Sequence, residues 1–129
     1  MAMTDSPHIT EVNESTFQQQ VIERSKDVPV LVDFWADWCA PCKMLMPVLQ
    51  KLVEEYEGAF ELAKVNTDLE RDLAAQHGIR SLPTLRLYRH GEVAEEVMGA
   101  QPESALRALL DNYIERASDA LLQQALALH

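Results

Sequence analysis

Residues 29–36 read Pro-Val-Leu-Val-Asp-Phe-Trp-Ala and lead, through Asp37 and Trp38, into Cys39-Ala40-Pro41-Cys42. The first eight are apolar apart from Asp33 and rich in β-branched and aromatic residues, a composition typical of a strand covered on both faces. Strands of this kind lie inside parallel or mixed sheets. We therefore expect residues 29–36 to form the central strand of the fold.

The rest of the chain predicts short strands that alternate with helices. From Cys39 an apolar stripe at helical spacing runs to Glu57-Gly58 and contains Pro47. Further patterns predict strands at 8–13, 60–66, 84–89 and 93–98, and helices at 15–26, 69–77 and 102–113. The order β-α-β-α-β-α-β-β-α predicts an α/β fold, with a central mixed β-sheet flanked by helices.

Individual positions within these elements carry finer expectations. Ser15 and Thr16 are expected to cap the first helix, and Gly58 to take the left-handed conformation after the long helix. Met44 and Met46 are expected to fill the core, because methionine adapts to irregular gaps.

Length and charge limit the function classes. A chain of 129 residues, 47% hydrophobic, fits one globular domain. The net charge of −10 repels nucleic acid and anionic membranes. No stretch approaches the roughly 18 apolar residues of a membrane span, and the N-terminus has no secretory pattern. We expect a cytoplasmic protein with neither nucleic acid nor membrane as a partner.

The pair Cys39 and Cys42 is the strongest chemical signal. Two cysteines cannot build the framework of a disulfide-rich domain, and in a reducing compartment such a pair is more often catalytic or metal-binding. At the start of a helix, free backbone N–H groups and the helix dipole favour a thiolate. We predict that Cys39 is the nucleophile and that Cys42, one turn later and deeper, resolves the mixed disulfide.

Two other interpretations of the pair are an inert structural pair and half of a zinc site. Zinc needs four ligands, whereas the histidines at 8, 77, 90 and 129 are scattered and no second Cys-x-x-Cys is present. Redox chemistry is therefore favoured, with no metal and no cofactor expected.

Asp33 is a carboxylate in the middle of an apolar strand. Burial raises the pKa of a carboxyl group, and one beneath a dithiol could take the proton of Cys42. Two alternatives stay open: Asp33 faces solvent at a sheet edge, or it is tied to a partner such as Lys64, which would hold its pKa down. We favour the proton relay.

Trp38 is expected to be a half-exposed platform for a peptide substrate, and Trp35 to pack in the core. Pro83 stands at the start of a predicted strand. Because most X-Pro bonds are trans, the residues alone do not indicate a cis bond between Leu82 and Pro83.

Four segments taken together resemble the thioredoxin family over roughly residues 8–114: Val32–Lys43, Ala63–Asn66, Gly78–Leu85 and Gly91–Val93. The resemblance implies a thioredoxin fold and a protein-disulfide reductase that works by dithiol exchange in cell redox homeostasis. It implies protein disulfides as substrates and thioredoxin reductase as the electron donor.

The same resemblance assigns residue roles. Cys39 attacks, Cys42 resolves, and Asp33 and Lys64 manage protons. Pro83 is expected in the cis form, and the backbone beside it pairs with an extended substrate. The expected substrate-binding residues are Trp38, Ala40, Pro41, Leu82 and Pro83.

The chain departs from the family at two places. Ala40 stands where the family usually has glycine, a change that could tune the potential and the stiffness of the loop. Beyond residue 114 the chain carries a second leucine-rich stripe, from Leu121 to Leu128. We divide the chain into an extended or disordered start (1–7), a thioredoxin domain (8–116) and a C-terminal helical extension (117–129).

The extension resembles the bacterial chaperedoxins, in which a thioredoxin domain precedes a tetratricopeptide-type helical region. It would then open a further helical domain, and the alternative function is a chaperone-associated redox module that binds unfolded clients and protects their cysteines. A longer last helix, folded on its own domain or used for dimerisation, is the other interpretation.

Overall fold

The computed structural model describes residues 6–114. The predictions for residues 1–5 and for the extension at 117–129 lie outside the described residues. The elements are β1 (Ile9–Glu11), η1 (Gln18–Glu23), η2 (Arg24–Lys26), β2 (Val30–Trp35), α1 (Ala40–Tyr56), β3 (Glu61–Asn66), α2 (Arg71–Gln76), β4 (Thr84–Arg89), β5 (Glu92–Met98) and α3 (Glu103–Asp111).

The strands form one mixed sheet in the order β1-β3-β2-β4-β5. β1 and β2 both run parallel to β3, whereas β4 is antiparallel to β2 and to β5. β2 is the central strand, as its apolar sequence predicts. The α/β class and the mixed sheet predicted above are confirmed.

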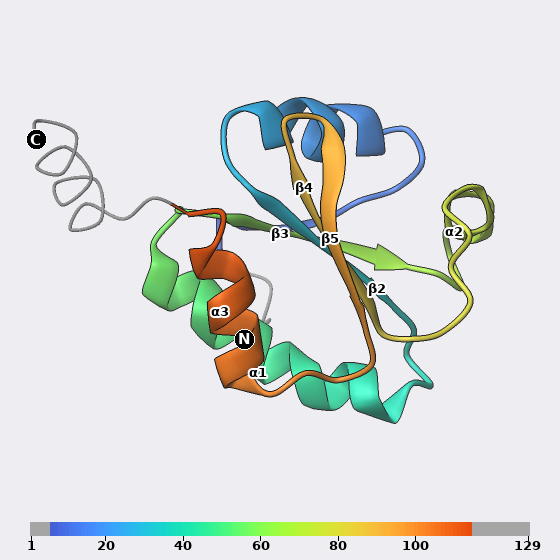
Figure 1. Cartoon of the computed structure of the whole chain (residues 1–129). Coiled ribbons are helices and arrows are strands. Elements are labelled where there is room, and N and C mark those ends of the chain that lie inside the picture. The colour runs from blue at the N-terminus through green and yellow to red at the C-terminus, as the bar shows by residue number, and fades with distance from the viewer. Residues whose placement is uncertain (1–5, 115–129) are drawn as a thin grey trace, which may run out of the picture.

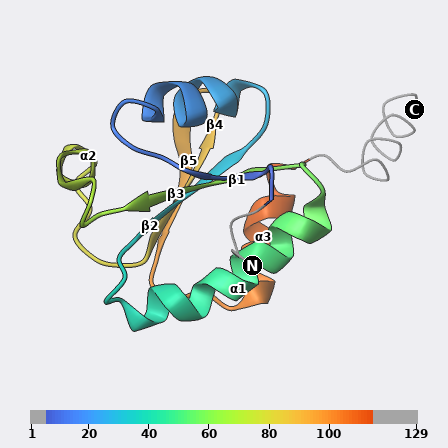
Figure 2. The ribbon, with the colours of Figure 1, turned by 180° about the vertical axis from the view of Figure 1, so that it is seen from behind.

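Helices cover both faces of the sheet. Figure 1 shows α1 and α3 together on one side and η1 with η2 on the other, and Figure 2 shows the same layers from behind. The alternation of side chains along β2 explains why both faces are apolar. Leu31 packs with residues of α1 and α3, whereas Val32 and Phe34 pack with Val21 of η1.

Two local expectations are wrong, on the cap of the first helix and on Met44. The first helix is a π-helix followed by a 3₁₀ turn, and Ser15 and Thr16 lie in the turn before it, where the Asn13 side chain accepts a hydrogen bond from the Thr16 N–H. Gly58 has a positive φ, as expected, and Glu57 before it is left-handed as well, at the end of α1. Met44 is 74% exposed, because it lies beside the buried stripe of α1 and not on it.

Candidate active site

A disulfide joins Cys39 and Cys42, whose Cα atoms are 5.3 Å apart. Cys39 is the N-cap of α1, in extended backbone conformation, and the backbone N–H of Cys42 donates a hydrogen bond to Cys39 Sγ over 3.2 Å. The first N–H groups of a helix have no acceptor within the helix. A negative charge on the Cys39 sulfur would therefore face a donor and the positive end of the helix dipole.

Burial does not distinguish the two cysteines. Cys39 is 3% exposed and Cys42 is 2% exposed. The sequence predicted that Cys42 lies deeper than Cys39, and their exposed fractions show no such difference. The disulfide brings both sulfurs into one small apolar cluster with Ala36, against which Trp35 and Leu82 pack. The two sulfur atoms differ in their place on α1: Cys39 is its N-cap, and the sulfur of Cys39 accepts the hydrogen bond from the Cys42 N–H.

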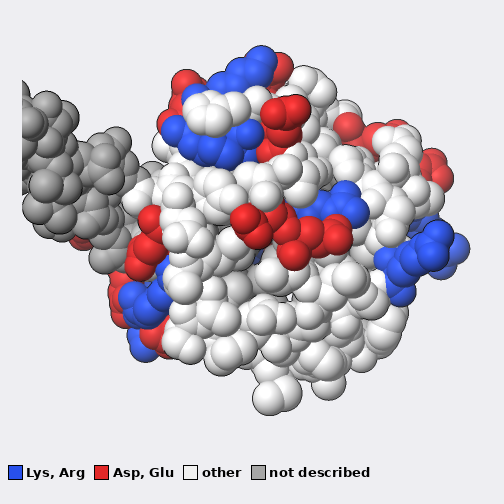
Figure 3. All heavy atoms as spheres, in the orientation of Figure 1, with Lys and Arg blue, Asp and Glu red and all other residues white. Residues whose placement is uncertain are grey.

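The residues beside the disulfide are exposed. Trp38 is 71% exposed, more than the half-exposure predicted, and Ala40 and Pro41 also face solvent. The disulfide therefore lies directly under a surface made by its chain neighbours. In the view of Figure 3 the lower part of the molecule is mostly free of charged side chains, whereas Lys, Arg, Asp and Glu gather at its left and upper edges.

A hollow of about 280 Å³ lies beside Trp38, the residue before Cys39. Trp38, Ile79 and Leu82 are among the residues that line it. Leu82 also contacts the disulfide cluster, so it connects the hollow with the sulfur atoms. The Leu82–Pro83 peptide bond is cis, as the family resemblance implies, and Pro83 is buried at the start of β4.

Asp33 is fully buried, and neither of its carboxylate oxygens has a hydrogen-bond partner. Burial raises the pKa of Asp33 from 3.8 to about 7; the positive charge of Lys64 opposes this rise, and the negative charge of Glu11 adds to it. The interpretation of Asp33 as a solvent-facing residue at a sheet edge is wrong. A carboxyl group with this pKa can both hold and release a proton at neutral pH.

Lys64 is in register with Asp33 on the neighbouring strand, but its ion pair is with Glu11. The Lys64 Nζ atom lies 3.3 Å from Glu11 Oε2 and 4.6 Å from the centre of the Trp35 ring. The interpretation in which Lys64 ties up Asp33 and holds its pKa down is therefore wrong. Sequence reasoning missed Glu11, whose role depends on a neighbour 53 positions away.

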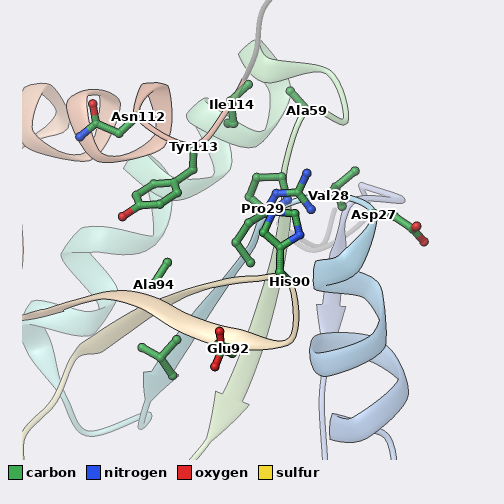
Figure 4. Close-up of a pocket in the computed structure, with 12 residues that line it drawn as sticks. Asp27, Val28, Pro29, Ala59, His90, Glu92, Ala94, Asn112, Tyr113 and Ile114 are labelled. Atoms are coloured by element: carbon green, nitrogen blue, oxygen red, sulfur yellow. The ribbon is translucent and has the colours of Figure 1, made fainter.

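A second hollow, of about 650 Å³, lies at the other end of β2. Pro29 lines it just before β2 begins, together with Ala59, His90, Glu92 and Tyr113, as Figure 4 shows. The disulfide follows the opposite end of β2. At a rise of about 3.3 Å per residue, the length of the strand places the disulfide roughly 20 Å from this hollow. This hollow is therefore no part of the redox site.

Within the described range, 6–114, no three His, Cys, Asp or Glu side chains gather in a way that could hold a metal ion. Over the same residues, no helix combines the length and the apolar character that a membrane crossing requires.

The sequence profile of the family described as Thioredoxin matches residues 8–112. A thioredoxin of Porphyra purpurea is 46% identical over 106 residues, which cover 82% of this chain and 97% of that protein. Thioredoxin 1 of a Nostoc species is 45% identical over 81% of this chain and 95% of its own length. A thioredoxin of Pseudomonas aeruginosa is 42% identical, over 82% and 96%.

Proposed function

The chain belongs to the thioredoxin family and is a thiol-disulfide oxidoreductase that reduces protein disulfides, and we propose that Cys39 is its attacking thiol and Cys42 its resolving thiol. The observation that carries this assignment is the hydrogen bond from the Cys42 N–H to Cys39 Sγ at the start of α1. It stabilises negative charge on Cys39, both before attack and when Cys39 leaves the disulfide.

The reaction proceeds in two exchanges. The Cys39 thiolate attacks one sulfur of the substrate disulfide, the substrate S–S bond breaks, and the other substrate sulfur leaves as a thiolate that takes a proton from water. The Cys42 thiolate then attacks Cys39 Sγ, the mixed disulfide breaks, and the second substrate sulfur leaves. Two electrons have passed to the substrate, and the protein holds the Cys39–Cys42 disulfide seen here.

Asp33 is proposed as the base that takes the proton of Cys42 in the second exchange. It lies on β2, the central strand that leads into the cysteine pair, and its pKa of about 7 suits a group that works at neutral pH. Lys64, next to it in register, is proposed to influence that proton through its positive charge, which favours the ionised form of Asp33. The absence of hydrogen bonds to the Asp33 oxygens leaves them free to accept it.

Substrate binding is proposed at the surface around the disulfide. Trp38 and Leu82 line the hollow of about 280 Å³. Ala40 and Pro41, in the first turn of α1, are exposed between the two cysteines. An extended substrate would pair with the backbone beside Pro83, by addition of a strand. Ala40 stands where the family usually has glycine. Its methyl group adds to this surface and reduces the conformational freedom of the backbone between the two cysteines.

As a member of its family, the protein takes its electrons from a partner reductase and passes them to protein disulfides. We propose that this donor is thioredoxin reductase, that the protein works in the cytoplasm in cell redox homeostasis, and that residues 8–116 are the redox domain. The cytoplasmic assignment is supported by cysteine usage: the chain has only the Cys39–Cys42 pair, a pattern more typical of catalytic pairs in reducing compartments than of disulfide-rich secreted domains. The chaperedoxin function is not proposed, because the leucine-rich stretch behind it lies outside the described residues.

Reduction of insulin driven by NADPH and thioredoxin reductase tests the assignment. Cys39→Ser should remove turnover, whereas Glu54→Gln, an exposed carboxylate on α1, should leave it unchanged. In single-turnover experiments Asp33→Ala should slow resolution more than first attack. Equal slowing of both steps would refute the role of Asp33, and turnover by Cys39→Ser would refute the mechanism.

A further inference from the structure

Three charged side chains form a row across the sheet. Glu11 on β1 is in register with Lys64 on β3, and Lys64 is in register with Asp33 on β2. Residues in register on neighbouring strands point to the same face. The residues two positions earlier, which are Ile9, Leu62 and Leu31, all pack in the core against α1 and α3. The row therefore lies on the α1 side of the sheet.

The row runs from solvent to the interior. The Glu11 side chain is 57% exposed, that of Lys64 only 8%, and Asp33 is fully buried. Lys64 lies between two carboxylates, and its ammonium group pairs with the outer one, that of Glu11. The same ammonium group lies over the ring of Trp35. The inner carboxylate is left without a hydrogen bond.

Among the described residues of the elements around Asp33, no other charge takes the place of Lys64. On β4, the residue in register with Asp33 is Leu85. The buried residues of α1 are uncharged. The charged side chains of α1 belong to exposed residues: Lys43, Lys51, Glu54 and Glu55. On α3, Glu103 and Arg107 pair with Lys51 and Glu55, and the exposed Asp111 accepts a hydrogen bond from the Tyr56 hydroxyl. The charge state of Asp33 therefore depends on where the Lys64 ammonium lies.

We propose that Glu11 is a positioning residue of the redox site, which holds the Lys64 ammonium toward the surface and so keeps Asp33 able to exchange a proton near neutral pH. The inference rests on the proposed role of Asp33 as the base for Cys42. Without Glu11, the ammonium would be free to pair with Asp33. A carboxylate paired in this way stays ionised and accepts protons poorly. Glu11 thus preserves the reactivity of a group to which it makes no hydrogen bond.

The test compares Glu11→Gln with the wild-type chain and with Glu54→Gln, which removes the same charge from the outer face of α1. The titration of the Asp33 carboxyl carbon is followed by ¹³C NMR, and the rate of mixed-disulfide resolution is measured against pH. In Glu11→Gln the Asp33 midpoint should fall by about one pH unit or more, because the loss of the Glu11 charge and the freed ammonium both favour the ionised form. Resolution should show its inflection at the same lower pH.

Two further variants make the result specific. Glu11→Asp keeps the charge and should restore most of the wild-type midpoint, whereas Lys64→Met should move the midpoint of Asp33 upward. A midpoint in Glu11→Gln that matches that of Glu54→Gln would overturn the role of Glu11, even if Asp33→Ala slows resolution. A midpoint that falls while the rate profile stays in place would instead refute the use of Asp33 as the base.

Discussion

The backbone N–H of Cys42 donates a hydrogen bond to the sulfur of Cys39, with 3.2 Å between the two atoms. This bond makes two equally buried sulfur atoms chemically different. When the disulfide opens, charge on Cys39 faces the N-terminal donors of α1, which makes Cys39 the better leaving group. A less basic leaving thiol accelerates exchange, so the cap geometry favours the release of Cys39. The same stabilised charge raises the fraction of Cys39 that is present as the thiolate for a new attack.

Asp33→Asn should stabilise the protein at high pH and leave its stability nearly unchanged at low pH. Asp33 binds its proton more tightly in the folded chain, with a pKa of about 7, than at the ordinary 3.8. Its contribution is therefore fully present below pH ~4 and is lost as the pH rises through ~7. A shift of about three units corresponds to about 4 kcal/mol at most.

Urea unfolding of both chains at pH 4.5 and pH 8 measures this effect. The gain in the free energy of unfolding from Asp33→Asn should be a few kcal/mol larger at pH 8. An equal difference at both pH values would show that Asp33 has an ordinary pKa in the folded protein.

Trp38→Ala should weaken the binding of protein substrates without unfolding the domain. Trp38 is 71% exposed and lines the hollow beside the disulfide, so its ring is available to a partner. Loss of an aromatic anchor costs about 1–2 kcal/mol, a rise of roughly 5- to 30-fold in KM for insulin. Met44→Ala is the matched control, because Met44 is equally exposed on α1 but does not line the hollow. A similar loss in both variants would contradict the assignment.

Ser25→Ala should destabilise the fold, although no sequence pattern singles Ser25 out. Its hydroxyl is buried, donates to the carbonyl of Ile22 over 2.7 Å and accepts the N–H of Gly91 over 2.8 Å. Removing it leaves a donor in the β4–β5 turn without its partner, which costs about 1–3 kcal/mol. Thermal unfolding checks this, with the exposed Ser104→Ala as the control, for which a change within about 0.5 kcal/mol is expected. Equal melting temperatures would argue against the buried bond.

Local patterns predicted the parts of the fold that place the cysteines. The apolar run at 29–36 became β2, residues 30–35, and Cys39 became the N-cap of α1. Both features depend on neighbouring residues only, namely the apolar composition of one strand and the first turn of one helix. Such features can be read from a single sequence.

Features that depend on distant contacts were not predictable. The pairing of Glu11 with Lys64 needs the register of β1 against β3, which no local pattern contains. Met44 looks like core filler by type, but the helical phase set by Leu45 and Leu49 turns it to solvent. Gly58 has the positive φ that its residue type predicts, but nothing in the local pattern indicates that Glu57 before it is left-handed as well.

The most direct test of the mechanism is to trap the mixed disulfide. Cys42→Ser removes the resolving thiol, so a reduced chain mixed with insulin should accumulate an adduct through Cys39 that mass spectrometry locates by peptide mapping. Cys39→Ser, treated in the same way, should form no such adduct on the time scale of turnover. An adduct that forms through Cys42 at a comparable rate would contradict the central claim that the cap of α1 makes Cys39 the attacking thiol.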